Sequence, residues 1–299
     1  MAIVVMTGGT SGFGLKCAHQ LLGKNGTRLI MGGRSSGPIG AMMFPLDLTR
    51  LADVRSFATQ VIEALGESKI DALIMNAGIS LSTTKERSAD GFELTFAVNH
   101  LAHYLLLRLL LPYLAEGAVV ELTTSGTHDP AEKTMLPVPR HVDARLLAHP
   151  ELDRERDSEP RIAGGRAYST SKLCNLLTAR ALAASPVAAA KRLRVVSYSP
   201  GPTPGTGLLR DSPPLVRAMW SAMGWPVIRH LFPRFSSSHT AAKELANLVL
   251  GVTEIPQGRI YSVLHRNRLD WPQLSELARR DDLMTALWRD SAILVGLSE

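Results

Sequence analysis

Short apolar runs rich in β-branched residues alternate with amphipathic segments along most of the chain. The runs are apolar throughout rather than alternately polar and apolar, which is typical of strands covered on both faces of a parallel sheet. The predicted strands are residues 2–6, 27–31, 41–44, 70–75, 118–122, 193–197 and 259–263. The predicted helices are residues 12–22, 51–65, 96–114, 167–184 and 240–250. This alternation predicts an α/β fold with a single doubly wound parallel sheet.

No linker interrupts the alternation, so residues 1–299 are predicted to form one domain. Residues 129–166 are rich in Pro, Arg, Asp and Glu, and we expect them to be a surface insertion beside the site. Residues 202–238 carry Met, Trp, Leu and Phe in short helical stretches. Such a segment favours a substrate lid, while a dimer contact and a membrane-surface patch stay open. A helical extension is expected at the C-terminus.

The chain has 33 Lys and Arg against 27 Asp and Glu, a formal charge of +6. The basic residues are scattered and aromatic residues are few, which argues against a nucleic-acid partner. A basic surface that attracts anionic ligands, such as a phosphorylated cofactor, accounts better for the charge. No apolar run is long enough to span a bilayer, and no signal sequence precedes the first strand. We therefore expect a cytoplasmic protein.

Cys17 and Cys174 fall inside helical patterns and lack the spacing of a metal site or a redox pair. Both are interpreted as reduced packing residues. A reactive Cys174 is the alternative, because it lies two residues after Lys172. Three histidines lack a spacing that fits a metal, so no metal is expected and structural roles are assigned to His100, His103 and His128.

The first strand leads through a glycine-rich turn, Thr7-Gly-Gly-Thr-Ser-Gly-Phe-Gly14, into the first helix. Glycines permit a tight turn, and backbone N–H groups with the helix N-terminus can bind a pyrophosphate. Alone this signal also fits a structural loop, but its place at the first strand–helix junction predicts a dinucleotide site. The residues expected to contact the cofactor here are Gly8, Thr10, Ser11, Gly12, Phe13 and Gly14.

The end of the second strand distinguishes NADP from NAD. An NAD site would have an acidic residue there for the ribose 2′-hydroxyl, whereas this sequence has Met31-Gly-Gly-Arg-Ser-Ser36. Arg34, helped by Ser35, can pair with a 2′-phosphate through its planar array of donors. We therefore expect NADP(H) as the cofactor, with a solvated Arg34 as the alternative.

Residues after the third and fourth strands complete the predicted cofactor site. Asp47 and Leu48 follow the third strand, where they can meet the adenine, although Asp47 also fits an N-cap of the helix at 51–65. The fourth strand ends in residues that let the chain pass close to the cofactor, namely Asn76, Ala77 and Gly78.

Tyr168 and Lys172 are four residues apart in a predicted helix, which places the phenol and the ammonium on one face. The pKa of a free tyrosine is about 10, so the phenol is a poor acid or base at neutral pH. A fixed cation nearby favours the phenolate and would bring the Tyr168 pKa toward the working range. A tyrosine and a lysine four residues apart are common in helices, so this spacing predicts a catalytic pair only together with the other motifs of the chain.

These features together resemble the short-chain dehydrogenase/reductase family. The resemblance covers nearly the whole chain and consists of the glycine turn, Asn76-Ala-Gly78, Asn99, Ser125, Tyr168 with Lys172, and Pro200-Gly201. It implies a Rossmann fold, a nicotinamide cofactor, and hydride transfer to a carbonyl or the reverse reaction from an alcohol.

The resemblance also implies catalytic roles. Tyr168 would give its proton to the developing alkoxide, while Lys172 would favour the phenolate and hold the nicotinamide ribose. Ser125 would hydrogen-bond the carbonyl oxygen. Asn99 would hold a water beside Lys172 that connects Tyr168 to solvent.

The same resemblance places Pro200 and Gly201 among the cofactor contacts. The family has a threonine four residues after this glycine, and its hydroxyl approaches the nicotinamide carboxamide. Here that position is Gly205, flanked by Thr203 and Thr206, and either threonine could take the role.

Finer features resemble the retinol dehydrogenase and protochlorophyllide reductase branch of the family. They are residues 90–93, 96–103, 125–128 and the long insertion before Tyr168, with segments 171–178, 206–210 and 287–297 similar to protochlorophyllide reductase in particular. Three positions depart from that enzyme: Gly78 replaces its alanine, Ser125 its usual threonine and Pro202 its functional cysteine. These departures argue against photochemical reduction.

The resulting hypothesis is an NADP(H)-dependent oxidoreductase acting on a carbonyl or alcohol of a bulky apolar substrate, such as a retinoid, steroid or polycyclic ketone. The alternatives are reduction of a tetrapyrrole double bond and a non-catalytic NADP-binding scaffold or sensor. The complete catalytic set argues against a scaffold, because binding alone would not require it. By analogy, a homodimer or homotetramer is expected through the helices at 96–114 and 167–184.

Overall fold

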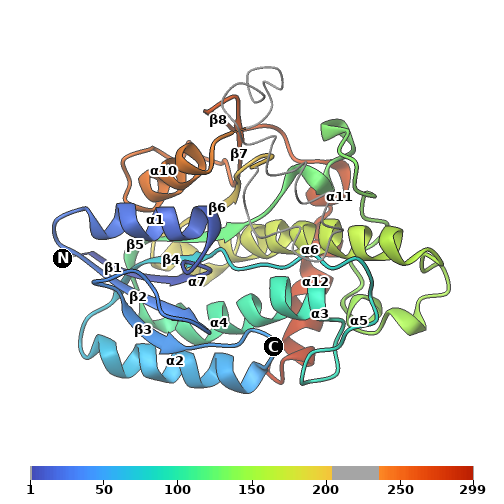
Figure 1. Ribbon diagram of the computed structural model, residues 1–299, viewed down its shortest axis with the longest axis horizontal. Helices are drawn as coiled ribbons and strands as arrows, with labels where there is room; N and C mark the ends of the chain where they lie inside the picture. The colour runs from blue at the N-terminus through green and yellow to red at the C-terminus, as the bar shows by residue number, and fades with distance from the viewer. Residues whose placement is uncertain (1, 204–235, 299) are drawn as a thin grey trace.

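The computed structural model describes residues 2–203 and 236–298. One sheet lies at its centre, with the strand order β3-β2-β1-β4-β5-β6-β7-β8 (Figure 1). The strands are β1 (Ala2–Thr7), β2 (Thr27–Gly33), β3 (Met42–Pro45), β4 (Ile70–Met75), β5 (Leu114–Thr123), β6 (Arg194–Ser199), β7 (Tyr261–His265) and β8 (Arg268–Asp270). Neighbouring strands are parallel except β7 and β8. The predicted α/β class with a single doubly wound sheet is confirmed.

Helices cover both faces of this sheet, and Figure 1 shows α1 and α10 on the side opposite α2 and α4. The first face carries α1 (Gly12–Leu22) and α10 (Ser238–Val249) over one apolar cluster. The other face carries α2 (Leu51–Leu65), α4 (Ala102–Leu110) and α6 (Pro160–Ala183) over a larger one. The shorter helices are α3 (Leu94–Phe96), α5 (Ala144–Ala148), α7 (Pro186–Ala190) and α11 (Glu276–Arg279). The last helix is α12 (Asp281–Leu294).

The strand order changes direction between β1 and β4. Strands β2 and β3 follow outward on one side of β1, and β5 to β8 follow on the far side of β4. In open α/β sheets, ligands bind beyond the carboxyl ends of the strands at such a switch point. The glycine turn after β1 and Asn76 after β4 both lie there.

The largest differences from the predicted boundaries lie at the end of the helix predicted over 96–114 and at the starts of β5 and α6. The helix predicted to end at residue 114 ends at Leu110 and continues as a 3₁₀ turn over Leu111–Tyr113, because Pro112 has no N–H for the α-helical ladder. Strand β5 therefore begins at Leu114, four residues early, and its pairing with β4 is irregular between Ile70 and Ala72. The antiparallel strand β8 was not predicted, since three residues are too few for a pattern.

The segment 129–166 is only partly the predicted surface insertion. Its last residues form the first turns of α6, where Pro160 occupies the N-terminus and the Glu159 carboxylate accepts bonds from the Arg161 and Ile162 N–H groups. Val142, Ala144 and Ala148 are buried in the larger apolar cluster. The abundance of Pro and charge hid these anchoring residues, which fasten the insertion to the domain.

The predicted lid at 202–238 lies mostly outside the described residues, which omit 204–235. Within it, only Pro202, Thr203 and residues 236–238 are described, and Ser238 is the first residue of α10. The lid therefore stays a prediction.

The C-terminal helical extension packs against the helices named for the oligomer interface. The Trp288 ring of α12 stands edge-on to Tyr104 at 5.0 Å, and the Tyr104 hydroxyl donates to the Trp288 carbonyl at 2.8 Å. Ser291 Oγ lies 2.8 Å from His100 Nε2. Residues 96–107 and 168–179 are fully buried within one chain. Residues 108, 109, 180 and 181, near the C-terminal ends of these helices, are partly exposed.

Residues Leu94–Tyr113 are long and apolar enough to cross a membrane by length and composition. However, 78% of the tested window is buried inside the protein, against the sheet and neighbouring helices. Among the described residues, this stretch is the one that meets the criterion, and its burial identifies it as a core helix.

Candidate active site

The glycine turn and the end of β4 are fastened together at the switch point. Gly8 and Gly12 have φ angles of 72° and 59°, which favour glycine. The Asn76 side-chain amide donates to the Gly8 carbonyl at 3.0 Å. A Cβ atom on Gly8 would lie 2.6 Å from the Ala77 main-chain nitrogen, and one on Gly14 would meet the Gly8 carbonyl oxygen. The turn needs glycine here, as expected of a pyrophosphate-binding turn.

The N-terminus of α1 follows directly. Ser11 is its N-cap, with extended backbone, and the Ser11 side chain makes no capping hydrogen bond. The first N–H groups of a helix lack intrahelical partners, so they and the exposed Ser11 hydroxyl can bind an anion. Thr10 and Phe13 are half-buried on either side. These residues therefore lie where the cofactor phosphates were predicted.

Arg34 and Ser35 follow β2 and are exposed. Among the described residues Arg34 has no ion pair, so its guanidinium is open to an anionic ligand. Asp47 accepts a bond from the Thr49 N–H at 3.0 Å, and the N-cap of α2 is Arg50. The N-cap alternative for Asp47 is therefore wrong, while its contact with the adenine stays a prediction. Leu48, half-buried, packs against the larger apolar cluster.

A buried histidine joins α4 to the cofactor edge of the sheet. His103 Nδ1 lies 3.1 Å from the Asn99 carbonyl oxygen, and His103 Nε2 lies 2.9 Å from Thr7 Oγ1. Since the carbonyl can only accept, Nδ1 carries the proton and Nε2 accepts from Thr7. Thr7 Oγ1 in turn accepts from the Ala77 N–H at 3.2 Å. The structural role expected for this histidine is thus a clamp behind the glycine turn.

Burial lowers the pKa of His103 to about 4, from 6.5 in an unfolded chain. Because the folded pKa is depressed, the stability from neutral His103 is present above pH 6.5 and is lost as the pH falls toward 4. We expect His103→Leu to lower the free energy of unfolding by about 1–3 kcal/mol at pH 7.5. The deficit should narrow in urea unfolding at pH 5. His239→Leu, at an exposed position on α10, should show no such narrowing.

Asn99 lies in a π-helical turn, Ala97–Leu101, between α3 and α4. Such a turn often marks a functional site. Its side-chain oxygen accepts from the Ile79 N–H at 2.8 Å, and its amide donates to the Ile79 carbonyl and to Ser171 Oγ, both at 2.9 Å. The carboxamide is fully used, so a water held by Asn99 would have to bind its main-chain carbonyl, which lies 3.1 Å from His103 Nδ1.

Ser125, Tyr168 and Lys172 meet beyond the carboxyl end of β5. Ser125 hydrogen-bonds the Tyr168 phenol. Lys172 Nζ donates to the Thr123 carbonyl at 3.1 Å and lies 5.8 Å from the centroid of the Tyr168 ring. A Cβ atom on Gly78 would come within 3.2 Å of Lys172 Nζ, so glycine there leaves space for the ammonium. Tyr168 and Lys172 are 5% and 3% exposed.

The protonation state of this pair differs from the expected one. Burial raises the pKa of Tyr168 to about 12, and the bond with Ser125 offsets only part of the shift. Burial also lowers the pKa of Lys172 to about 8, although nearby Glu121 raises it. The expectation that Lys172 lowers the Tyr168 pKa is wrong here. The Lys172 ammonium points to the Thr123 carbonyl, and the loss of hydration around the buried phenol has the larger effect on the Tyr168 pKa. Tyr168 is therefore protonated at neutral pH.

The segment after β6 carries the remaining predicted contacts. Gly201 has a φ of 65°, and a Cβ atom there would meet the Leu264 carbonyl oxygen, so glycine is required. The buried Thr203 hydroxyl donates within this turn to the Pro200 and Gly201 carbonyls at 3.0 and 3.1 Å. Thr206 lies outside the described residues. The choice between the two threonines stays a prediction.

Comparison with known proteins agrees with this geometry. The family model for short chain dehydrogenase matches residues 2–135. Dehydrogenase/reductase SDR family member 13 from Bos taurus is 30% identical over 311 residues, which cover 98% of this chain and 73% of that protein. The chain belongs to the short-chain dehydrogenase/reductase family. Proteins of this family use a nicotinamide cofactor, and the glycine turn fits one.

Further relatives support the predicted branch of the short-chain dehydrogenases/reductases. Protochlorophyllide reductase B, chloroplastic, of Oryza sativa subsp. japonica is 29% identical over 319 residues, covering 99% of this chain and 77% of that protein. An uncharacterized protein from Mycobacterium Paratuberculosis has a solved structure with a TM-score of 0.69, 26% identity and coverage of 100% and 94%. NADPH bound carbonyl reductase from chicken fatty liver shares the fold, with a TM-score of 0.60, 16% identity and coverage of 88% and 97%.

Two cysteines and two further histidines of this short-chain dehydrogenase/reductase are buried. Cys17 and Cys174 are free and buried, and burial raises the pKa of both thiols, which fits packing residues. Burial lowers the pKa of His100 to about 3 and of His128 to about 4, so both are neutral. In the described ranges, no three His, Cys, Asp or Glu side chains gather as a metal ion would need.

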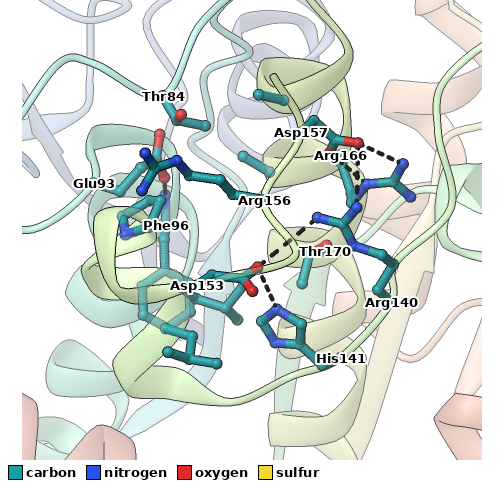
Figure 2. Close-up of a pocket in the computed structure, with 15 residues that line it drawn as sticks. Thr84, Glu93, Phe96, Arg140, His141, Asp153, Arg156, Asp157, Arg166 and Thr170 are labelled. Atoms are coloured by element: carbon teal, nitrogen blue, oxygen red, sulfur yellow. Dashed lines mark hydrogen bonds and ion pairs between the residues drawn. The ribbon is translucent and has the colours of Figure 1, made fainter. Parts of the chain in front are cut away.

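A pocket between the insertion and α6 is not the catalytic site. It is lined by Ala163, Ala167 and Thr170 on the face of α6 opposite Tyr168 and Lys172. Figure 2 shows Asp153 and Asp157 paired with basic residues that line the same pocket. Asp157 bonds Arg166 at 2.7 Å and Arg140 at 3.2 Å, and Asp153 bonds His141 at 3.3 Å. The bond to Arg166 fastens the insertion to the catalytic helix, and the other two pairs lie within the insertion.

Sequence reasoning missed three buried residues behind the site. Thr7 and Thr123 make the hydrogen bonds described above, and the negative charge of Glu121 raises the pKa of Lys172. The threonines resemble ordinary strand residues. Glu121 left a signal, because a charged residue inside the apolar run 118–122 is unusual for a strand covered on both faces.

Proposed function

We propose that the protein is an NADP(H)-dependent oxidoreductase that transfers a hydride between the nicotinamide and a carbonyl or alcohol of a bulky apolar substrate. The observation that carries the proposal is the meeting of Ser125, Tyr168 and Lys172 beyond β5, beside the glycine turn. The apolar composition of residues 202–238 supports the substrate class.

The residues divide the chemistry between them. When bound, the nicotinamide supplies or takes the hydride. In the reduction, Ser125 orients the carbonyl oxygen, and Tyr168, which is protonated at neutral pH, gives its proton to the developing alkoxide. The Lys172 ammonium stabilises the phenolate that this proton transfer creates. Asn99 holds the chain after β4 in place through Ile79.

The choice of NADP(H) rests on Arg34 and Ser35, which are exposed just beyond β2 with no acidic residue among residues 31–36. Arg34→Ala should weaken NADPH binding by about 10–100-fold, because a charge-assisted bidentate pair contributes roughly 1.5–3 kcal/mol. NADH binding should change little. Fluorescence titration with NADPH and with NADH measures the two dissociation constants, and their ratio gives the preference of each variant.

Arg268→Ala is the matched control, because Arg268 is an exposed arginine on β8. It should leave both affinities unchanged. An Arg34→Ala protein that keeps its preference for NADPH would contradict the assignment of the 2′-phosphate.

A second candidate is reduction of a tetrapyrrole double bond, which the protochlorophyllide reductase relatives favour. The departures at Gly78, Ser125 and Pro202 weigh against it. NADPH oxidation should be measured with a panel of apolar aldehydes and ketones, and with protochlorophyllide in dark and light. Turnover of a carbonyl supports the first candidate. Turnover of protochlorophyllide alone would replace it, and cofactor binding without turnover would favour the scaffold.

Placement and assembly stay predictions. We propose a cytoplasmic enzyme that acts on a small apolar molecule, with the membrane-surface contact of residues 202–238 as an alternative use of that segment. The homodimer or homotetramer expected by analogy through the helices at 96–114 and 167–184 stays a proposal, and residues 96–107 and 168–179 of these helices are buried within one chain.

A further inference from the structure

Glu121 is a fully buried carboxylate within the sheet. It lies on β5 between Ile74 of β4 and Val196 of β6, both members of the apolar cluster under α1 and α10. One carboxylate oxygen accepts from Thr123 Oγ1 at 2.8 Å. The other has no hydrogen-bond partner among the described residues. An apolar side chain would avoid the desolvation cost of this group, so its presence points to a role other than packing.

Thr123 connects Glu121 to two parts of the active site. Its carbonyl accepts from Lys172 Nζ and from the Asn175 side-chain amide, both at 3.1 Å. Its hydroxyl also lies 3.4 Å from the Asn76 side-chain oxygen, and Asn76 holds the glycine turn through Gly8. Glu121 is therefore one residue away from both the catalytic lysine and the cofactor turn.

The charges around Glu121 come from several elements. Burial raises the pKa of Glu121 to about 8, while the Thr123 hydroxyl and the Lys172 ammonium lower it. Cys17 of α1 and Tyr198 of β6 face it as neutral groups with raised pKa values. Two further groups lie behind these neighbours: His103 of α4 faces Lys172, and Glu244 of α10 faces Tyr198. Lys172 is thus the cation that faces the carboxylate.

We propose that Glu121 is a positioning residue for hydride transfer: through Thr123 it holds Lys172 in place, and its negative charge keeps Lys172 an ammonium at alkaline pH. The proposal rests on the proposed function, in which that ammonium stabilises the Tyr168 phenolate. Glu121 touches neither substrate nor cofactor, and it acts only through these neighbours.

The test is Glu121→Gln, because glutamine has the shape of a protonated glutamate and lacks only the charge. Turnover should match the unmodified protein within about twofold at pH 6, where Glu121 is protonated. As the pH rises, the alkaline decline in kcat should begin roughly one pH unit earlier in the variant, the scale of losing one carboxylate near the lysine. KM for the carbonyl should change little.

Glu93→Gln is the matched control. Glu93 is another buried glutamate, whose pKa burial raises to about 7, and its carboxylate caps α3 away from Lys172. This variant should lose stability and keep the alkaline decline in its original place. If Glu121→Gln behaves in the same way, Glu121 is only a structural residue and the proposal is overturned.

A second measurement does not depend on catalysis. In protein labelled with ¹³Cε-lysine, the Lys172 signal is identified by its loss in Lys172→Met, and its titration midpoint should fall by roughly one unit in Glu121→Gln. An unchanged midpoint in the folded variant would overturn the proposal. If the Lys172 midpoint shifts but the unmodified protein reduces no carbonyl, the charge interaction between Glu121 and Lys172 is supported and the proposed reaction is rejected.

Discussion

Tyr168→Phe should lower turnover by about 10² or more, the scale of losing a positioned acid. The phenol is buried, bonded to Ser125 and protonated at neutral pH, so it is the group able to protonate an alkoxide. Phenylalanine keeps the ring and removes only the hydroxyl. NADPH affinity should therefore stay nearly unchanged, while kcat for a carbonyl falls. Stopped-flow oxidation of NADPH and fluorescence titration measure the two quantities.

Tyr104→Phe is the matched control for this variant. The Tyr104 hydroxyl bonds the Trp288 carbonyl on the far side of α4, so its loss should cost about 1 kcal/mol of stability and leave kcat unchanged. A folded Tyr168→Phe protein with normal turnover would remove Tyr168 from the reaction. Ser125 would then be the remaining hydroxyl at the carbonyl oxygen.

The fold was predictable because its local signals agree with its tertiary structure. Apart from the run in the edge strand β3, each apolar run lies in a strand with neighbours on both sides and helices on both faces, so most of the run is buried. The failures have local causes. Pro112 ended a helix early, and the start of α6 at Pro160 lay inside a charged segment that favoured a loop.

The candidate site was predictable as a set of neighbours, because the carboxyl ends of parallel strands meet at one edge of the sheet. Asn76, Ser125, Lys172 and the glycine turn meet there. The electrostatics were not predictable. Whether a cation or burial dominates the Tyr168 pKa depends on where Lys172 points, and only the fold shows that it points to the Thr123 carbonyl.

Lys172→Met should reduce kcat by about the same factor as Tyr168→Phe. The cause differs, because this variant loses the positive charge near the phenolate and keeps the proton donor. The ammonium lies 5.8 Å from the centroid of the Tyr168 ring. A charge at about this distance from a developing phenolate contributes roughly 3 kcal/mol at an effective dielectric constant near 20, or about 10² in rate. Methionine fills the volume and removes the charge. Because the proposed contact with the nicotinamide ribose is also lost, NADPH binding should weaken, which separates this variant from Tyr168→Phe.

The pH dependence distinguishes the role of the charge from simple packing. Burial lowers the pKa of Lys172 to about 8, so the unmodified enzyme loses its ammonium, and with it turnover, as the pH rises through 8. Lys172→Met has no ammonium to lose, and the ratio of the two kcat values should shrink above pH 8. Lys243→Met, at an exposed position on α10, should keep the full profile. A constant ratio across this range would mean that Lys172 only fills space.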